Sequence, residues 1–315
     1  MAIRERFCVI FNPVAGKGRT RAHREDILNA MDADGLDYAL FETGGPLHAT
    51  ELARSAGLKG FTVVVAVGGD GTVNEVVNGL MAAHNEGDPV PTLAILPLGR
   101  GNDFSAGACI PSALSMAISF LSAGVRQPLD VGRIRGGDYP EGKYFINGIG
   151  IGFDTIVGLH AARMKHVPGA LGYLFGALKT FVQYPEAPEV TIAWEGGSVH
   201  QRAHQISIMN GKRMGGLFWM APEASVHDGL FDACFTRDLK RWPMLTGILA
   251  YIRKTQFSRD DFSGARSPWF TIEAPAGGLV VHADGETICT DGKSLAIECI
   301  SRCLDIITCP LDITG

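Results

Sequence analysis

The chain lacks any block of basic residues. Its 28 lysine and arginine residues face 33 aspartate and glutamate residues, a net charge of −5, with both signs spread along the sequence. Proteins that bind nucleic acid usually gather basic residues on one face or in one arm, so we expect no nucleic-acid partner. Hydrophobic residues make up 46% and charged residues 19% of the chain, which excludes a largely disordered protein.

A secretion signal is also missing. Residues 1–6 lead directly into the strand-like run Phe7–Phe11, without the apolar core and small-residue cleavage site of a signal peptide. We therefore expect a cytoplasmic location.

Cysteine pairs with metal-binding spacing are absent. None of the seven cysteines belongs to a C-x-x-C pair, and Cys299, Cys303 and Cys309 lie in strand-like sequence without the spacing of a zinc site. We predict that the cysteines are reduced and structural. His200 and His204 lie in an extended stretch and would not share a helical face, so no metal role is expected for them.

No long apolar run is free of helix breakers. The 22 residues between Asp103 and Arg126 carry no charge, and roughly 20 apolar residues suffice to cross a bilayer. Pro111, two glycines and five serines interrupt this run. We predict instead a surface helix that starts after Pro111 and ends at Gly124. Its apolar stripe consists of Leu114, Ala117, Ile118 and Leu121.

Glycine, in contrast, is abundant, with 40 of 315 residues against a usual level of about 7%. The length predicts two domains. In residues 1–128, Val- and Ile-rich strands alternate with amphipathic helices, which predicts an α/β domain with an open parallel sheet covered on both faces. The expected strands are 7–12, 38–42, 61–67 and 93–96, and the expected helices are about 20–33, 48–57 and 73–84.

Residues 129–315 have a different pattern, in which short alternating runs are separated by Gly, Pro and Asp turns. This pattern predicts an antiparallel β domain, interrupted by a helical insert at about 154–184. We place the linker near Gln127–Pro128, and the last dozen or so residues are expected to pack back on the first domain. The expected strands are 143–146, 190–194, 205–209, 230–235, 269–273, 278–282 and 294–300.

Three glycine-rich loops, 12–18, 68–74 and 97–103, directly follow strands of the first domain. The carboxyl ends of parallel strands meet at one edge of the sheet, so the three loops should converge on one crevice. Loop glycines let backbone N–H groups approach phosphate oxygens, and the helix after Thr72 adds its positive N-terminal end. The alternative, ordinary strand-to-helix turns, fits one such loop well and three poorly.

Two common nucleotide motifs are absent from these loops. The first loop is not a P-loop, because Phe11 stands where its first glycine would be and Gly18 follows Lys17. The second loop lacks G-x-G-x-x-G, because Asn74 replaces the last glycine.

The motifs occur in an order that resembles a known family. The Asn12-Pro loop is followed by Gly68-Gly-Asp-Gly-Thr-Val-Asn-Glu-Val-Val-Asn78 and Leu96-Pro-Leu-Gly-Arg-Gly-Asn-Asp-Phe104, and the second half adds 147–154, 221–232 and 282–286. Over essentially its whole length the chain resembles the diacylglycerol kinase catalytic-domain superfamily, in particular the bacterial soluble lipid kinases of the diacylglycerol kinase B and YegS type, which are related to sphingosine kinases.

The resemblance implies a three-layer α/β nucleotide domain like that of NAD kinase and phosphofructokinase, and an antiparallel β-sandwich with a helical insert. It implies transfer of the γ-phosphoryl group of ATP to a lipid hydroxyl, with Mg²⁺, in a cleft between the two domains. Asp284 would be the general base, with Glu286 in the metal network and Asp70 near the phosphates and Mg²⁺. The residues that would line the nucleotide are Asn12, Pro13, Val14, Ala15, Gly16, Thr43, Gly68, Gly69, Asp70, Gly71, Thr72, Val73, Asn74, Arg100 and Asp103.

A second, structural magnesium would be bound by Asp228 with the carbonyl groups of Ser225 and Leu230. The chemistry is consistent with these roles: phosphoryl transfer depends mainly on positioning and charge neutralisation, and Mg²⁺ prefers oxygen ligands. Asp284-Gly and Asp228-Gly also match common hairpin turns, so a purely structural role stays open for both. Arg100 departs from the threonine common in the family; it could contact phosphate or brace Asp103.

The helical insert combines apolar and basic residues, which suits a lid that touches a membrane surface; a plain packed helix pair is the alternative. The expected partner is thus a lipid presented at the inner face of the membrane, and a homodimer is compatible with the sequence. The residues concerned are Arg163, Lys165, His166, Leu171, Leu174, Phe175, Leu178, Lys179 and Phe181.

The sequence leaves three functional hypotheses. The first is a lipid kinase that uses MgATP, with diacylglycerol as the first acceptor and sphingoid bases, ceramide or phosphatidylglycerol as others. The second is a kinase of a soluble acceptor such as NAD. The third is a catalytically silent protein that binds lipid or nucleotide.

Overall fold

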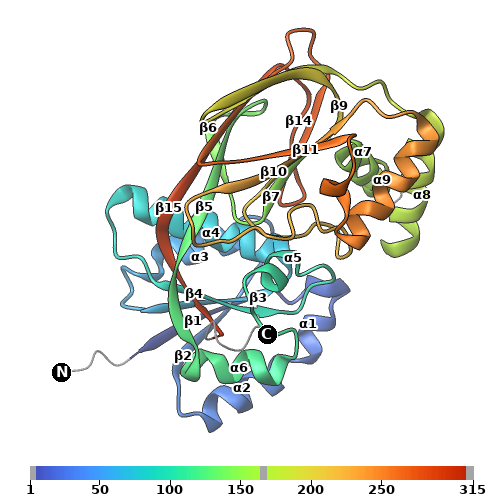
Figure 1. Cartoon of the computed structure of the whole chain (residues 1–315). Helices are drawn as coiled ribbons and strands as arrows, with labels where there is room; N and C mark the ends of the chain where they lie inside the picture. The colour runs from blue at the N-terminus through green and yellow to red at the C-terminus, as the bar shows by residue number, and fades with distance from the viewer. Residues whose placement is uncertain (1–4, 164–168, 310–315) are drawn as a thin grey trace.

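The chain forms an α/β unit and a β-rich unit that lie end to end (Figure 1). The structure is a computed structural model, and it describes residues 5–163 and 169–309. The α/β unit occupies the lower half of Figure 1, and helices gather on one side of the β-rich unit above it.

The α/β unit contains a parallel sheet in the order β4-β3-β1-β2. Its strands are β1 (Arg6–Phe11), β2 (Asp37–Glu42), β3 (Val63–Gly68) and β4 (Thr92–Pro97). Its helices are η1 (Ala15–Lys17), α1 (Arg19–Ala22), α2 (Arg24–Ala33), α3 (His48–Ala56), α4 (Asp70–Glu86), α5 (Asp103–Gly107) and α6 (Leu114–Ala123). The four strands predicted in this unit are confirmed. The helices predicted at about 20–33, 48–57 and 73–84 are confirmed too, the first as α1 and α2, whereas η1 and α5 were not predicted.

Alternate side chains of these strands enter two separate cores, one on each face of the sheet. Val64 and Ile95 pack with α3 and α4 on one face, while Val65 and Leu96 pack with α2 and α6 on the other. This period-2 alternation between two covered faces explains why the strands are apolar throughout. The predicted helix after Pro111 is α6, which buries Ala117, Ile118 and Leu121. Within the described ranges, no helix is both long and apolar enough to cross a membrane.

The β-rich unit is antiparallel and encloses a core between two groups of strands. Its strands are β5 (Val125–Gly136), β6 (Tyr139–Phe145), β7 (Gly148–Gly152), β8 (Glu189–Trp194), β9 (Gly197–Met209), β10 (Phe231–Arg237), β11 (Phe262–Ser267), β12 (Trp269–Glu273), β13 (Leu279–Ala283), β14 (Glu286–Gly292) and β15 (Ser294–Thr308). Among these strands, β5, β7, β11 and β14 were not predicted from the sequence.

The helical insert forms two helices, α7 (Phe153–Arg163) and α8 (Gly169–Gln183). A third helix that the sequence analysis missed, α9 (Arg241–Arg253), lies beside them, followed by the short η2 (Gln256–Ser258). Phe181 of α8 contacts Trp242 of α9, with ring centroids 5.7 Å apart. Residues 165 and 166, and the side chains of residues 163, 171 and 174, were part of the lid prediction and lie outside the described residues.

Two long strands connect the units. Gln127 and Pro128, predicted as a linker, lie inside β5, which pairs with β15 along most of its length. β15 runs from the upper unit into the lower one (Figure 1), where Ile306 pairs in parallel with Leu93 of β4. The chain therefore passes between the units in continuous strands, and the domain boundary at residues 128 and 129 stays a prediction.

Candidate active site

The three glycine-rich loops meet at the carboxyl edge of the parallel sheet. The side-chain amide of Asn12 donates to the Thr72 hydroxyl at 2.9 Å, which joins the first loop to the second. A Cβ atom built on Gly99 would lie only 2.4 Å from the Cα of Gly69, so the second and third loops touch through their backbones. Only glycine permits that approach. The three loops therefore converge, as predicted.

Each predicted nucleotide-lining residue lies in these loops, in the first turns of the following helices, or just after β2. Asp70 is the first residue of α4, whose N-terminal N–H groups have no side-chain cap, and such uncapped groups attract anions. Thr43 follows β2 and donates its N–H to the Phe11 carbonyl at 2.9 Å. Val14 is 72% exposed at the rim. The nucleotide contacts themselves stay a prediction.

Arg100 is exposed and its guanidinium makes no hydrogen bond or ion pair within the described part of the chain. It does not brace Asp103. That role belongs to Arg213, whose Nε lies 3.2 Å from Oδ1 of Asp103 and whose Nη2 donates to the Gly101 carbonyl at 3.1 Å. Arg213 comes from the β-rich unit and has no motif around it, so the sequence offered no signal for this contact.

Asp70 and Asp103 form an acidic pair at the mouth of the crevice. Burial and the charge of Asp70 raise the pKa of Asp103 to about 6, although the Gly216 backbone N–H, 2.9 Å from Oδ1, and Arg213 oppose the rise. A carboxylate with a raised pKa in a pocket is a frequent mark of a functional site. The pair has more negative charge than its protein partners neutralise, so it suits a cation.

Asp284 occupies a tight hairpin between β13 and β14. Asp284 and Gly285 have φ values of +49° and +84°, as a two-residue hairpin turn with two left-handed residues requires. The carboxylate nevertheless points into the protein, where it accepts four hydrogen bonds of 2.8–3.0 Å. The donors are the N–H groups of Ile146, Asn147 and Gly148 and the side-chain amide of Asn74. Asp284 is thus both the predicted turn residue and a candidate functional group.

Asn74 ties this carboxylate to the second glycine-rich loop. It lies one turn into α4, so the bond to Asp284 joins residues 210 positions apart. Asn78, one turn further along α4, links Asn74 to β6. It donates to the Asn74 carbonyl oxygen at 2.9 Å and accepts from the Tyr144 N–H at 3.2 Å. The Asn-x-x-x-Asn spacing of α4 therefore positions Asp284 against the second glycine loop.

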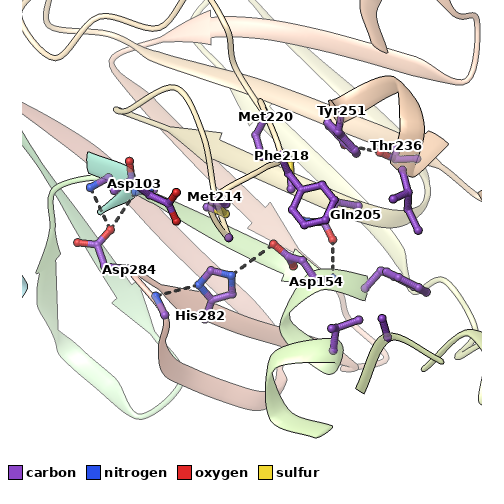
Figure 2. Close-up of a pocket in the computed structure, with 18 of the residues that line it drawn as sticks. Asp103, Asp154, Gln205, Met214, Phe218, Met220, Thr236, Tyr251, His282 and Asp284 are labelled. Carbon is purple, nitrogen blue, oxygen red and sulfur yellow. Dashed lines mark hydrogen bonds and ion pairs between the residues drawn. The ribbon is translucent and has the colours of Figure 1, made fainter. Parts of the chain in front are cut away.

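One cavity of about 310 Å³ joins these groups (Figure 2). Asp70, Asp103 and Asp284 line its polar end. Apolar side chains from α7, α8, α9 and the loop before β10 line much of the rest, among them Phe153, Val157, Met214, Phe218, Met220, Met244 and Ile248. Much of this apolar wall comes from α9 and from residues 214–220, segments in which no motif was recognised from the sequence.

A second polar group, absent from the sequence prediction, faces the same cavity. His282 of β13 places Nε2 3.3 Å from Oδ2 of Asp154, at the start of α7. The Asp154 N–H donates to the side-chain oxygen of Gln205 at 3.0 Å. Gly150 provides the space, because a Cβ there would lie 2.2 Å from the Asp154 carboxylate and 2.4 Å from the imidazole. The Gly-Ile-Gly-Ile-Gly-Phe-Asp run was the available signal.

The remaining predicted residues lie apart from this cavity. Glu286 forms an ion pair with Lys143 and does not line the cavity. Asp228 pairs with Arg266 at 2.6 Å and accepts from the Leu230 N–H at 3.0 Å. In the described ranges no group of three or more His, Cys, Asp or Glu side chains could hold a metal ion. The roles of Glu286 and of the Ser225, Asp228 and Leu230 set stay predictions.

Comparisons with known proteins find matches along both halves of the chain. Residues 6–134 match the family model described as the diacylglycerol kinase catalytic domain, and residues 147–308 match the YegS C-terminal NAD kinase beta sandwich-like domain. Diacylglycerol kinase of Bacillus subtilis is 30% identical over 226 residues, 71% of each chain. Lipid kinase YegS of Escherichia coli K12 is 31% identical over 280 residues, 86% of each chain.

Solved structures show the same fold. A diacylglycerol kinase from Bacillus anthracis matches with a TM-score of 0.72 and 22% identity over 98% of both chains. Yeast NADH kinase matches with a TM-score of 0.51 and 10% identity, over 98% of this chain and 85% of that one. The predicted fold class, an α/β nucleotide domain and a β-sandwich with a helical insert, is confirmed.

The family matches define a phosphotransferase of the kinase class. The chain belongs to the diacylglycerol kinase catalytic-domain family, in the branch that carries a YegS-type β-sandwich.

Proposed function

We propose that this kinase transfers the γ-phosphoryl group of ATP to the hydroxyl group of a lipid, with diacylglycerol as the first candidate acceptor and phosphatidic acid as the product. One observation carries the proposal: a single cavity has carboxylates at one end and apolar side chains along much of the remaining wall. Such a pocket suits a ligand with a polar reacting group and an apolar body. The names of the two bacterial relatives point the same way.

The converging loops would hold the nucleotide. Their glycine backbones and the uncapped N-terminus of α4 suit phosphate oxygens, and the free Arg100 adds a cation beside them. Mg²⁺ is usually bound by substrate phosphates with one or two carboxylates rather than by a cage of protein ligands. Asp70 and Asp103 fit that role, because they are two neighbouring carboxylates and Arg213 pairs with Asp103 alone among the described residues. When bound, the ion would neutralise charge on the transferred phosphate.

Asp284 would accept the proton of the acceptor hydroxyl. Both of its oxygens already accept two hydrogen bonds, so the hydroxyl must displace one donor. Three donors are backbone N–H groups, which cannot rotate away, whereas the fourth is the Asn74 side chain. We infer that Asn74 yields its bond when the acceptor binds.

The outer faces of α8 and α9 would contact the membrane that presents the lipid. Trp242 is 72% and Val182 61% exposed, although both helices contribute inward side chains to the apolar cavity. Neither helix contains an acidic residue, and exposed basic residues such as Lys179 and Arg253 lie on them. An apolar face with basic neighbours suits an anionic bilayer.

Transfer of labelled γ-phosphate to diacylglycerol in mixed micelles tests the proposal. We expect phosphatidic acid from the wild-type protein and a loss of about 10² to 10⁴ in kcat for Asp284→Asn, the range of a missing general base. Asp138→Asn is the matched control, because Asp138 also lies in a β-turn of this unit but is exposed. Full activity of Asp284→Asn would exclude the base role.

Other acceptors are distinguished in the same assay. Labelled product from NAD rather than from lipid would favour the soluble-acceptor hypothesis, and tight ATP binding without turnover on any lipid pool would favour a silent binding protein. The apolar wall of the cavity favours the lipid, and a survey of a total lipid extract would separate diacylglycerol from sphingoid bases, ceramide and phosphatidylglycerol.

A further inference from the structure

His282 and Asp154 form a buried pair that the proposed reaction does not use. The pair faces the cavity two residues away from Asp284 (Figure 2). Asp154 is fixed in turn, since its Oδ1 accepts from the Thr155 N–H at 2.6 Å and its own N–H donates to Gln205 at 3.0 Å. The imidazole ring is therefore oriented by a rigid partner.

The other ring nitrogen of His282, Nδ1, binds the backbone of the Asp284–Gly285 turn. Gly285 donates its backbone N–H to Nδ1 of His282 at 3.2 Å, and the Asp284 N–H donates to the Gly148 carbonyl at 3.0 Å. Asp284 is a non-glycine residue in the left-handed region, a conformation that persists only when surrounding contacts hold it. These two bonds hold the backbone N–H groups of the turn.

The two hydrogen bonds specify the protonation state of the ring. Nδ1 can accept from Gly285 only if it carries no proton, and the proton of the neutral ring then lies on Nε2, directed at Asp154. A doubly protonated imidazolium would point an N–H at the Gly285 N–H, so the bond to the turn would be lost.

We propose that His282 is a positioning residue for phosphoryl transfer: its neutral imidazole, oriented by Asp154, fixes the Asp284–Gly285 turn, and protonation of the ring releases that turn. The inference rests on the proposed role of Asp284 as the base. It predicts that activity falls on acidification through a group that never touches the acceptor.

The charges around His282 set the direction of this effect. Burial disfavours the imidazolium, but the carboxylates of Asp154 and Asp284 outweigh burial and raise the pKa of His282. Burial likewise opposes ionisation of Asp154, yet His282 and the hydrogen bonds to Asp154 lower its pKa. The Gly285 N–H opposes protonation of Nδ1, because two N–H groups would then face each other. The ring is therefore protonated, and the turn released, as the pH falls.

Two substitutions separate the hydrogen bond from the titration. Asn at position 282 can offer an oxygen where Nδ1 lies but does not titrate, whereas Leu has similar bulk and no acceptor. At pH 8 we expect His282→Asn to keep kcat within about threefold and His282→Leu to lose about 100-fold, the cost of a small misplacement of a reacting group. The KM for MgATP should not change in either, and the acid limb of kcat should move to lower pH in His282→Asn.

A second measurement keeps this test independent of the kinase assay. Amide hydrogen exchange at Gly285 should accelerate at least tenfold in His282→Leu and stay near wild type in His282→Asn. Equal exchange in all three proteins would overturn the proposal, as would wild-type kcat and pH dependence in His282→Leu. A wild-type protein without phosphoryl transfer would count against the proposed function alone, since the exchange result still decides whether His282 holds the turn.

His200 provides the matched control. It forms a similar pair with Glu189, 2.8 Å apart, on the exposed face of β8 and β9. His200→Leu should leave kcat, its pH dependence and Gly285 exchange unchanged, and a loss equal to that of His282→Leu would show a general effect of removing a histidine.

Discussion

At the scale of single residues, Asp284 and Gly150 each fit a common local structure and also make contacts within the cavity wall that the local sequence does not reveal. Asp284 satisfies a common hairpin turn, yet its side chain collects four hydrogen-bond donors. Gly150 looks like a strand glycine, yet its missing Cβ makes room for the Asp154–His282 pair. At both positions the backbone conformation follows from the neighbouring sequence. The contacts that the Asp284 side chain makes, and the space that Gly150 leaves free, involve residues far along the chain.

Asp103 makes the stability of the protein depend on pH. Its pKa is raised to about 6 in the folded state, so the folded protein binds this proton more tightly than the unfolded chain does. The stabilising contribution is complete below pH 3.8 and is lost as the pH rises through about 6. We expect Asp103→Asn, which cannot ionise, to raise the free energy of unfolding at pH 7.5 by about 3 kcal/mol, and by much less at pH 4.

Urea unfolding at the two pH values measures this difference, with Asp138→Asn as the control for removing one exposed carboxylate. A larger gain at pH 4 than at pH 7.5 would show that the sign is wrong. MgATP should bind more weakly to Asp103→Asn despite its greater stability, because the carboxylate that costs stability is the one proposed to face the metal.

At the scale of secondary-structure elements, α9 has two apolar faces, one that lines the cavity and one that is exposed. Met244, Gly247, Ile248 and Tyr251 line the cavity, while Trp242, Leu245, Leu249 and Ile252 are exposed on the other side. A helix that is apolar on two faces is unusual at a protein surface. We therefore expect α9 to insert beside α8 into the membrane interface.

Replacing Trp242 and Leu249 by serine should weaken sedimentation with vesicles of anionic phospholipid at least tenfold, since each apolar side chain contributes about 1.5–3 kcal/mol when fully buried. Phosphorylation of a short-chain, water-soluble acceptor should be unaffected. Leu58→Ser, at a 65% exposed leucine of the other unit, is the control. Unchanged binding of the double variant would place the membrane contact elsewhere.

The elements that the sequence predicted well are those defined by local periodicity. The four parallel strands and their helices follow from Val- and Ile-rich runs and glycine-rich turns, and the convergence of the three loops follows from the geometry of a parallel sheet. α9 was missed because Pro243 and Gly247 obscure a helix that tertiary packing stabilises. Arg213 and His282 were missed because their roles exist only through contacts between distant segments.

At the scale of the whole molecule, one strand, β15, belongs to the sheets of both units. β15 pairs with β5 in the upper unit and with β4 in the lower one, and Leu304 and Ile306 belong to the core of the α/β unit. A fragment of residues 1–128 would leave the edge of β4 unpaired and this part of the core exposed. Unpaired edges of this kind promote aggregation.

We accordingly expect the 1–128 fragment to aggregate or to lack a cooperative thermal transition, in contrast to the intact chain. Circular dichroism and analytical ultracentrifugation of the two proteins provide the measurement. A monomeric fragment that unfolds cooperatively would establish residues 1–128 as an autonomous domain, as the boundary predicted from the sequence implies.

The path of β15 also has a consequence for biosynthesis. Leu93 leaves the ribosome 213 residues before its strand partner Ile306, which at about 5–20 residues per second is a delay of roughly 10 to 40 s. During translation the nascent α/β unit therefore exposes the unpaired edge of β4. This edge is covered only when β15, the last strand to be synthesised, pairs with β4. The sheet of the α/β unit thus gains its last strand only when translation of the chain is nearly complete.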